Sequence, residues 1–123
     1  MTQIYKFKVT LCESENYIWR DIEISSLSSV AKLAYTILAA FEAEASHLFN
    51  IVCSGTRYEF LYDNDLDFYD DYETVPIPPN AVKLTSLRLN VGDSMTMEYD
   101  YGAGWEFNIC LMSVTDMKKG AGT

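Results

Sequence analysis

The feature that most limits the fold of this chain is a hydrophobic period that changes along its length. Residues 3–11 and 17–24 alternate between apolar and polar side chains, whereas apolar residues between 27 and 41 recur at intervals of three and four. Alternation buries one face of a strand, and a period of about 3.6 residues buries one stripe of a helix. The pattern therefore predicts an antiparallel hairpin followed by a core-facing helix over residues 28–42.

The same pattern assigns a face to each side chain of the hairpin. Tyr5, Phe7, Val9 and Leu11 share one face of the first strand. The second strand has Ile18, Arg20, Ile22 and Ile24 on one face. Several serines before the helix are competent N-caps, and the sequence does not choose among Ser25, Ser26 and Ser28. The apolar stripe of the helix consists of Leu27, Val30, Leu33, Ala34, Ile37, Leu38, Ala40 and Phe41.

The rest of the chain shows a second set of strand signals. Residues 48–53 and 56–62 are rich in strand-forming side chains around a Ser-Gly turn, and alternation returns at 95–101 and 105–114. Residues 62–80 are expected to form a surface loop, and 83–89 suit a short helix or a strand equally well. The prediction is an α+β domain over residues 1–117, with one main helix, strands 3–11, 17–24, 95–101 and 105–114 in one sheet, and a flexible tail at 118–123.

The negative net charge of the chain argues against some classes of binding partner. The 123 residues include 18 acidic and 9 basic side chains, which gives a formal net charge of −9. Nucleic acids and anionic membranes attract basic surfaces, so direct binding to either is not expected. No apolar run is long enough to span a bilayer, and the first residues lack the apolar core of a signal peptide. We therefore expect a soluble cytoplasmic protein.

One third of the acidic residues are concentrated between positions 62 and 73, where no basic residue occurs. Aromatic side chains alternate with these carboxylates, a combination that suits docking to a basic protein. A solvated loop without a role is the alternative. A calcium loop of the EF-hand type is disfavoured, because Phe68 and Thr74 stand where it needs Gly and Glu. The candidate partner-binding residues are Asp63, Asp65, Asp67, Phe68, Tyr69, Asp70, Asp71, Tyr72 and Glu73.

The cysteines and the single histidine give no sign of a metal or cofactor site. Cys12, Cys53 and Cys110 are far apart in sequence, without the close pairs that structural zinc sites use, and His47 stands alone. We expect no metal and no cofactor. Cys12 and Cys110 lie in apolar runs and are predicted to be small buried side chains.

Four residues are candidates for a ligand pocket. Arg20 lies on an apolar face, where a charge needs a partner, so it is expected to pair with Asp100 or Glu98 or to bind an anionic ligand. Trp105 follows a Gly-Ala-Gly turn and either anchors the core or covers a ligand. His47 either packs after the helix or acts as a base or ligand. The candidate pocket thus comprises Arg20, His47, Asp100 and Trp105.

Three segments resemble the plasmid pRiA4b ORF-3-like family. Residues 17–22 (YIWRDI) resemble its P-x-I-W-R-R-I strand, and residues 46–51 (SHLFNI) its S-H-L-x-x-F segment. Residues 91–93 (VGD) and 98–107 (EYDYGAGWEF) resemble its motif G-D … Y-x-Y-D-F-G-D-x-W-E-H. The resemblance implies an α+β domain with a mixed, mostly antiparallel, β-grasp-like sheet on a helix. It also implies genes carried by plasmids and transposable elements, and no established activity.

The chain departs from this motif at two positions that matter for chemistry. Ala103 stands where the family has an acidic residue, and Phe107 stands where it has His. We therefore expect no enzymatic activity. The favoured hypothesis is an interaction module that binds a basic, nucleic-acid-binding partner and inhibits host defence, as an anti-CRISPR-type DNA mimic would. The alternatives are a ligand-binding domain or enzyme that uses the 102–105 hairpin and Arg20, and a structural or regulatory partner of a neighbouring gene product.

Neutralising the acidic segment tests its role. Replacing Asp65, Asp67, Asp70 and Asp71 by Asn is expected to raise the free energy of unfolding slightly, because it relieves a repulsion that is screened over about 10 Å at 0.1 M salt. The same variant should bind a basic partner more weakly and with a flatter salt dependence. Urea denaturation and binding titrations measure the two effects. Unchanged affinity at low salt would mean that the segment is only a solvated connection.

Overall fold

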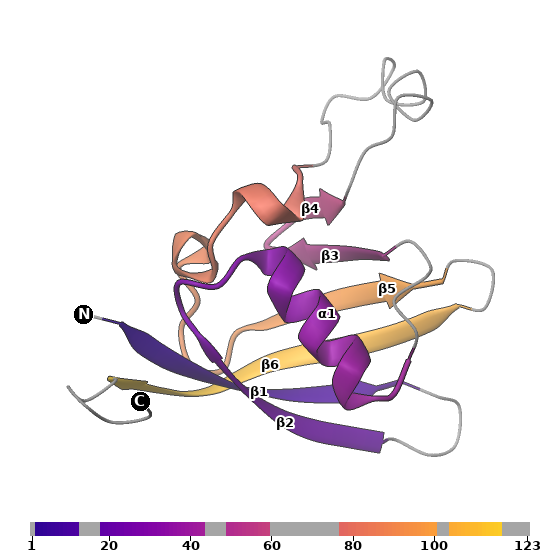
Figure 1. Cartoon of the computed structure of the whole chain (residues 1–123), viewed down its shortest axis with the longest axis horizontal. Helices are drawn as coiled ribbons and strands as arrows, with labels where there is room; N and C mark the ends of the chain where they lie inside the picture. The colour runs from indigo at the N-terminus through magenta and orange to yellow at the C-terminus, as the bar shows by residue number, and fades with distance from the viewer. Residues whose placement is uncertain (1, 13–17, 44–48, 60–76, 101–103, 117–123) are drawn as a thin grey trace.

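The computed structural model of the chain describes residues 2–12, 18–43, 49–59, 77–100 and 104–116. These residues form six strands, one α-helix and two short 3₁₀ helices (Figure 1). In chain order the elements are β1 (Gln3–Leu11), β2 (Ile18–Ser25), α1 (Val30–Ala40), β3 (Phe49–Cys53), β4 (Thr56–Glu59), η2 (Pro79–Ala81), η3 (Leu84–Leu87), β5 (Ser94–Tyr99) and β6 (Trp105–Asp116).

All six strands belong to one sheet, in the order β2-β1-β6-β5-β3-β4. Every pair of neighbouring strands is antiparallel. Three of these pairs, β1–β2, β3–β4 and β5–β6, are consecutive in the chain, where a hairpin connection makes antiparallel pairing the expected one. Parallel pairing among the described residues is limited to an isolated bridge between Tyr58 and Ile77. The α+β class with one main helix is confirmed, and so is the common sheet of the four predicted strands. The β-grasp likeness remains a prediction.

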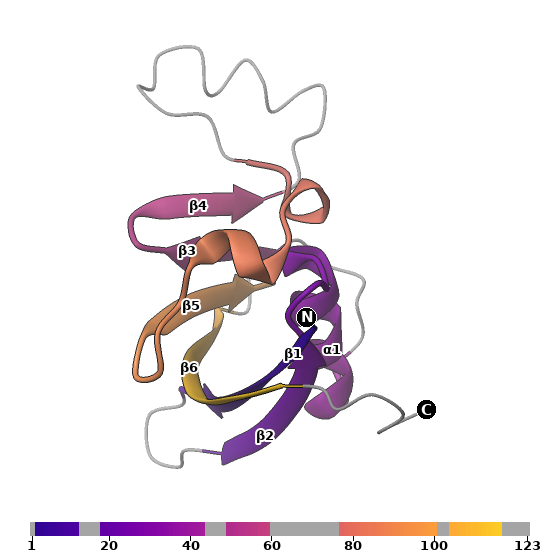
Figure 2. The same ribbon diagram turned by 90° about the vertical axis from the view of Figure 1, so that its left-hand side faces the viewer.

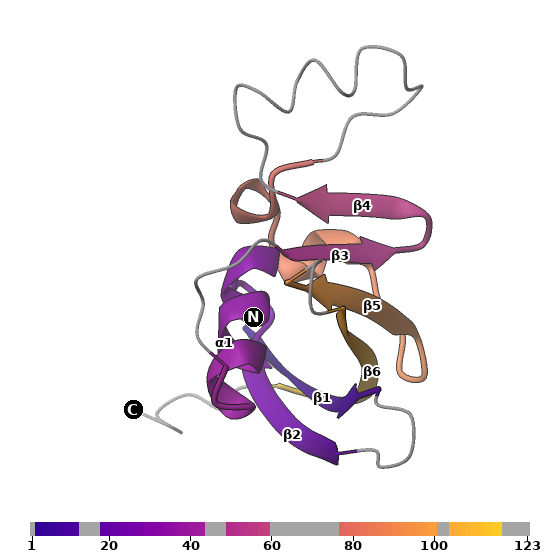
Figure 3. The same cartoon turned by 90° about the vertical axis from the view of Figure 1, so that its right-hand side faces the viewer.

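The helix α1 lies across one face of the sheet, and the other face carries no described helix (Figures 1 and 3). The core fills the space between them, as the alternating pattern predicted. On the inner face of β1 the side chains of Tyr5, Phe7, Val9 and Leu11 are all buried. The buried residues of α1 are Val30, Ala31, Leu33, Ala34, Ile37 and Leu38.

Two apolar side chains assigned to the core are exposed instead. Ile22 and Ile24 of β2 are buried, but Ile18, the first residue of this edge strand, is 41% exposed. Leu27 is 50% exposed, because the helix begins at Val30 and Leu27 therefore lies outside the helical stripe.

The N-cap of α1 is Ser29, which is none of the three serines that the sequence offered as candidates. Its side-chain oxygen accepts a hydrogen bond from the backbone N–H of Lys32 at 3.0 Å. Two of the other serines serve different donors: Ser26 Oγ accepts from Gln3 N–H, and Ser25 Oγ accepts from Leu27 N–H. The serine hydroxyls before the helix thus accept hydrogen bonds from three different backbone N–H groups, one of which belongs to β1.

The segment after η2 fixes the start of the helix. Val30 N–H donates to the carbonyl of Val82 at 2.9 Å, and Leu84 N–H donates to that of Ser28 at 2.9 Å. Leu84 is fully buried. Of the two alternatives for the stretch 83–89, the structure shows the short helix: it contains the 3₁₀ helix η3, which brings Leu84 into the core.

Some sequence-based expectations lie outside the described residues. These are the tail 118–123, the end of the strand predicted over 56–62, and most of the loop predicted over 62–80. The described end of that loop contains η2. Within the described part of the chain, no helix combines the length and apolar character needed to cross a membrane.

The cap assignment can be tested with a matched pair of variants. Ser29→Ala is expected to lower the free energy of unfolding by about 1 kcal/mol, because the N–H of Lys32 loses its acceptor. Ser28→Ala, one residue earlier, should change it by less than about 0.5 kcal/mol. Equal effects of the two substitutions in urea denaturation would contradict the assignment.

Candidate functional site

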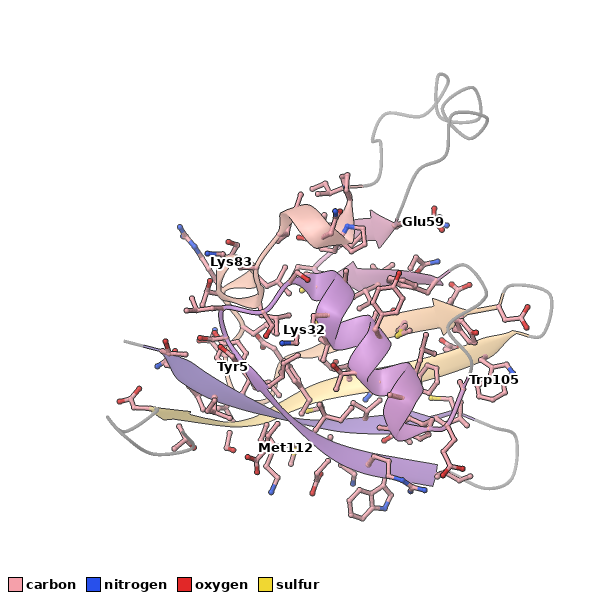
Figure 4. All side chains as sticks on the ribbon, viewed as in Figure 1. Tyr5, Lys32, Glu59, Lys83, Trp105 and Met112 are labelled. Atoms are coloured by element: carbon pink, nitrogen blue, oxygen red, sulfur yellow. The ribbon has the colours of Figure 1, made fainter. Side chains whose placement is uncertain are left out.

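An aromatic cluster, formed by Phe41, Tyr99, Trp105 and Phe107, connects two of the four candidate pocket residues. The Trp105 ring lies 6.2 Å from that of Tyr99 and 6.5 Å from that of Phe107, centroid to centroid. Phe107 lies 5.1 Å from Phe41, the residue that follows α1. The guanidinium carbon of Arg20 is 5.6 Å from the centroid of the Phe41 ring. The cluster therefore joins Arg20 to Trp105 through Phe41, the C-cap of the helix. Figure 4 shows Trp105 on the side of the molecule where α1 ends.

Arg20 makes different contacts from those expected. It is exposed, and its Nη1 donates a hydrogen bond to the carbonyl of Trp19 at 2.8 Å. Among the described residues it forms no ion pair. The carboxylates proposed as partners belong to β5 and the turn after it, and β1 and β6 lie between that strand and β2. The strands β2 and β5 are therefore three strand spacings of about 4.8 Å apart. This distance is too large for the guanidinium of Arg20 to contact either carboxylate directly.

Trp105 is half-buried and packs against the hydrophobic core, as expected of an anchor. Asp100 begins the turn before it, with a left-handed backbone (φ 53°) that Asp tolerates better than most residues. Gly104 N–H donates to the Asp100 carbonyl at 2.7 Å, so the two residues close the turn between β5 and β6. His47 lies outside the described residues.

A second feature, which sequence reasoning missed, is a row of polar side chains on the face of the sheet opposite α1. The strand registers place Glu59 opposite Asn50, Asn50 opposite Glu98, and Glu98 opposite Glu106. We call these four residues the acidic row. Glu98 and Glu106 are exposed, and among the described residues neither forms an ion pair. Alternation assigns these residues to one face, but only the register places them side by side.

The end of the acidic row that lies on β4 and β3 is buried. The side chain of Glu59 is 8% exposed and forms an ion pair with Arg57 at 3.1 Å. Asn50 beside it is also buried. A buried carboxylate requires such a partner, because desolvation of an unpaired charge is costly. The unbalanced negative charge therefore lies toward the other end of the row, on β5 and β6.

The acidic segment predicted to bind a partner is attached next to this row. Its nine candidate residues, from Asp63 to Glu73, lie outside the described residues. The chain leaves the sheet at Glu59 and returns at Ile77, and these two residues are joined by a hydrogen bond from Glu59 N–H to the Ile77 carbonyl at 3.0 Å. Ile77 N–H in turn donates to the Arg57 carbonyl at 3.0 Å. The described residues on either side of the segment, Glu59 and Ile77, are thus joined at β4.

The cysteines do not form a site. All three are free thiols, and no group of three or more metal-binding side chains occurs in the described part of the chain. The prediction that Cys12 is buried is wrong: it follows the last residue of β1 and is exposed, and Cys110 is only half-buried. The buried thiol is that of Cys53, whose pKa is raised by burial.

A comparison with protein families tests whether the chain belongs to the family that its motifs resemble. The model of the plasmid pRiA4b ORF-3-like protein family matches residues 3–122. The chain belongs to this family. A search of curated proteins finds no match.

The family fold is also found in a solved structure, a protein of unknown function (MM3350) from Methanosarcina mazei Go1. The two chains superimpose with a TM-score of 0.78 at 19% sequence identity, which shows a common fold. The match covers 99% of this chain and 66% of that protein, so this chain spans just under two thirds of the other's length.

Within the family motif, the structure explains the departure at Phe107. The side chain is fully buried in the aromatic cluster, between the rings of Phe41 and Trp105. An imidazole at this position would lie among apolar rings and would need a hydrogen-bond partner there. In this member of the family the position serves packing.

Restoring the family residue tests that assignment. Phe107→His is expected to lower the free energy of unfolding by about 3 kcal/mol, because it removes buried apolar contacts and buries a polar ring. Asn108→His, on the opposite face of β6, should change it by less than about 0.5 kcal/mol. Thermal or urea denaturation measures both. A stable Phe107→His variant would show that the cluster accommodates a polar group.

Proposed function

We propose that this chain is a non-enzymatic interaction domain whose acidic surface binds a basic partner protein. The surface consists of the exposed part of the acidic row, Glu98 and Glu106, together with the neighbouring segment 60–76. The observation that carries the proposal is that Glu98 and Glu106 lie directly opposite each other on β5 and β6, exposed and without an ion pair among the described residues.

Directly opposed like charges oppose strand pairing by roughly 0.2–1 kcal/mol. A cation supplied by a partner would remove this repulsion and gain an attraction. Six further carboxylates occur in the segment 60–76, and the described residues on either side of it, Glu59 and Ile77, are joined at β4, two strands from β5. Charges of one sign gathered in this way produce a field that speeds association with a basic surface.

The partner class that best fits this chemistry is a protein with a surface built for phosphates. Carboxylates can take the place of phosphates on such a surface, so a nucleic-acid-binding protein would be held and inhibited. The family takes its name from a plasmid open reading frame. We therefore favour a cytoplasmic role on a mobile genetic element, as an inhibitor of host defence of the anti-CRISPR DNA-mimic type. A ligand site at Arg20 is less well supported, because its guanidinium already contacts Trp19 and Phe41.

A capture experiment with matched variants tests the proposal. The chain is immobilised at low salt in lysate of its native host, and the retained proteins are identified by mass spectrometry. Retention of a basic protein is expected, with release as salt is raised. For that protein, Glu98→Gln with Glu106→Gln should weaken binding about fivefold, because two exposed charge contacts are lost.

The control removes the same number of charges elsewhere. Glu42→Gln with Asp116→Asn changes exposed carboxylates outside the acidic row and should leave the affinity within about twofold. Equal losses for the two double variants, or binding that does not depend on salt, would contradict the proposed surface.

A further inference from the structure

In the part of the chain that the structure describes, the strand β2 leaves one edge of the sheet open. The opposite edge, at β4, is covered in part by Ile77, which bridges to Tyr58. Among the described strands β2 pairs only with β1, and Figures 2 and 3 show no described element beyond it. An open edge presents backbone N–H and C=O groups that can pair with another strand.

The register identifies which backbone groups face outward. Ser26 N–H donates to the Gln3 carbonyl at 2.8 Å, so alternate residues before it, including Ile22 and Ile24, direct their backbone groups toward β1. The backbone groups of Trp19, Asp21 and Glu23 therefore point to the open edge. The hydrogen bond from Arg20 Nη1 to the Trp19 carbonyl agrees with this direction.

The side chains along this edge show what kind of strand fits. Asp21 is paired in register with Lys8 of β1, and Glu23 with Lys6. Lys6 Nζ also lies 3.8 Å from an oxygen of Asp21. Between the two lysines, Phe7 is opposite Ile22 in the core. The segment Lys6-Phe7-Lys8 is thus an internal example of a strand that satisfies β2, with a basic–apolar–basic pattern.

We propose that the open edge of β2 binds an extended segment of another protein, antiparallel to β2, with basic residues opposite Asp21 and Glu23 and an apolar residue between them opposite Ile22. Asp21 and Glu23 each exchange two backbone hydrogen bonds with the basic residue opposite. This is strand addition to a sheet edge, in which the main chain gives affinity and the side chains give selectivity. The proposal shares no residue with the acidic row and stands independently of the proposed function.

The charges argue against a second copy of this chain as the occupant. Two β2 strands paired about Ile22 would place Asp21 of one copy opposite Glu23 of the other. Pairing about Asp21 would place that residue opposite itself. Like charges in direct opposition disfavour both arrangements. The same carboxylates that disfavour these two self-pairings favour a basic strand at this edge.

A short peptide of alternating lysine and valine is the probe, titrated into the whole chain and followed by NMR. Saturation is expected to slow the exchange of the amide protons of Asp21 and Glu23, which face the open edge. The amides of Ile22 and Ile24, already bonded to β1, should be unchanged. This alternating protection distinguishes backbone pairing from contact through side chains alone.

Two N-methylated peptides provide the matched control. Methyl groups on the lysine amides, which would face β2, are expected to weaken binding about tenfold or more, because they remove donors and block close approach. Methyl groups on the valine amides, which would face away, should have little effect. Equal binding of the two peptides would overturn the proposal.

Protein variants separate this inference from the proposed function. Asp21→Asn with Glu23→Gln should weaken binding of the unmodified peptide about fivefold, through the loss of two cross-strand charge pairs. Glu98→Gln with Glu106→Gln should leave it unchanged. The reverse result would place the peptide on the acidic row and overturn strand addition at β2. A dimer of the free chain with protected Asp21 and Glu23 amides would also overturn it.

Discussion

The register of β1 between its two neighbours is the constraint on which the rest of the structure depends. Because side chains alternate along a strand, a shift of one residue would turn Tyr5, Phe7, Val9 and Leu11 toward solvent and bring lysines into the core. With the observed register, these four side chains are buried beneath α1, and Lys6 and Lys8 lie opposite Glu23 and Asp21. One pairing thus sets both the core and the charge ladder on the outer face.

The two faces of the sheet have correspondingly different chemistry at the hairpin that carries the family motif. On the inner face, Trp105 and Phe107 join Phe41 in an aromatic cluster that is apolar throughout. On the outer face of the same strands, Glu98 and Glu106 are exposed. Phe107, at the position where the resembled motif has His, is a fully buried core side chain. What the hairpin presents to solvent is negative charge, and this contrast is the reason for favouring an interaction domain.

The acidic row and the β2 edge lie at different places on the sheet and would bind in different ways. The row offers charge without backbone groups, since β5 and β6 are interior strands. The β2 edge offers backbone groups flanked by two carboxylates. Both favour basic partners, so a single protein with a basic folded surface and a basic extended segment could engage both. Two weak contacts joined in one partner would then reinforce each other through effective concentration.

Periodicity was enough to predict the helix and the four long strands and to say which face of each is buried, because it reports the local geometry of side chains. The motifs were enough to indicate the family. Which of these faces meet depends on how the chain packs in three dimensions. Arg20 contacts Phe41 instead of a carboxylate, Cys12 is exposed just after the end of β1, and Ser29 caps the helix because it directly precedes the first helical residue, Val30. The acidic row depends on pairing β3 with β5, two strands that are distant in sequence. The choice of which strands pair depends on the apolar area that the whole sheet buries. The strands have similar alternating patterns, so no single strand specifies its own partner.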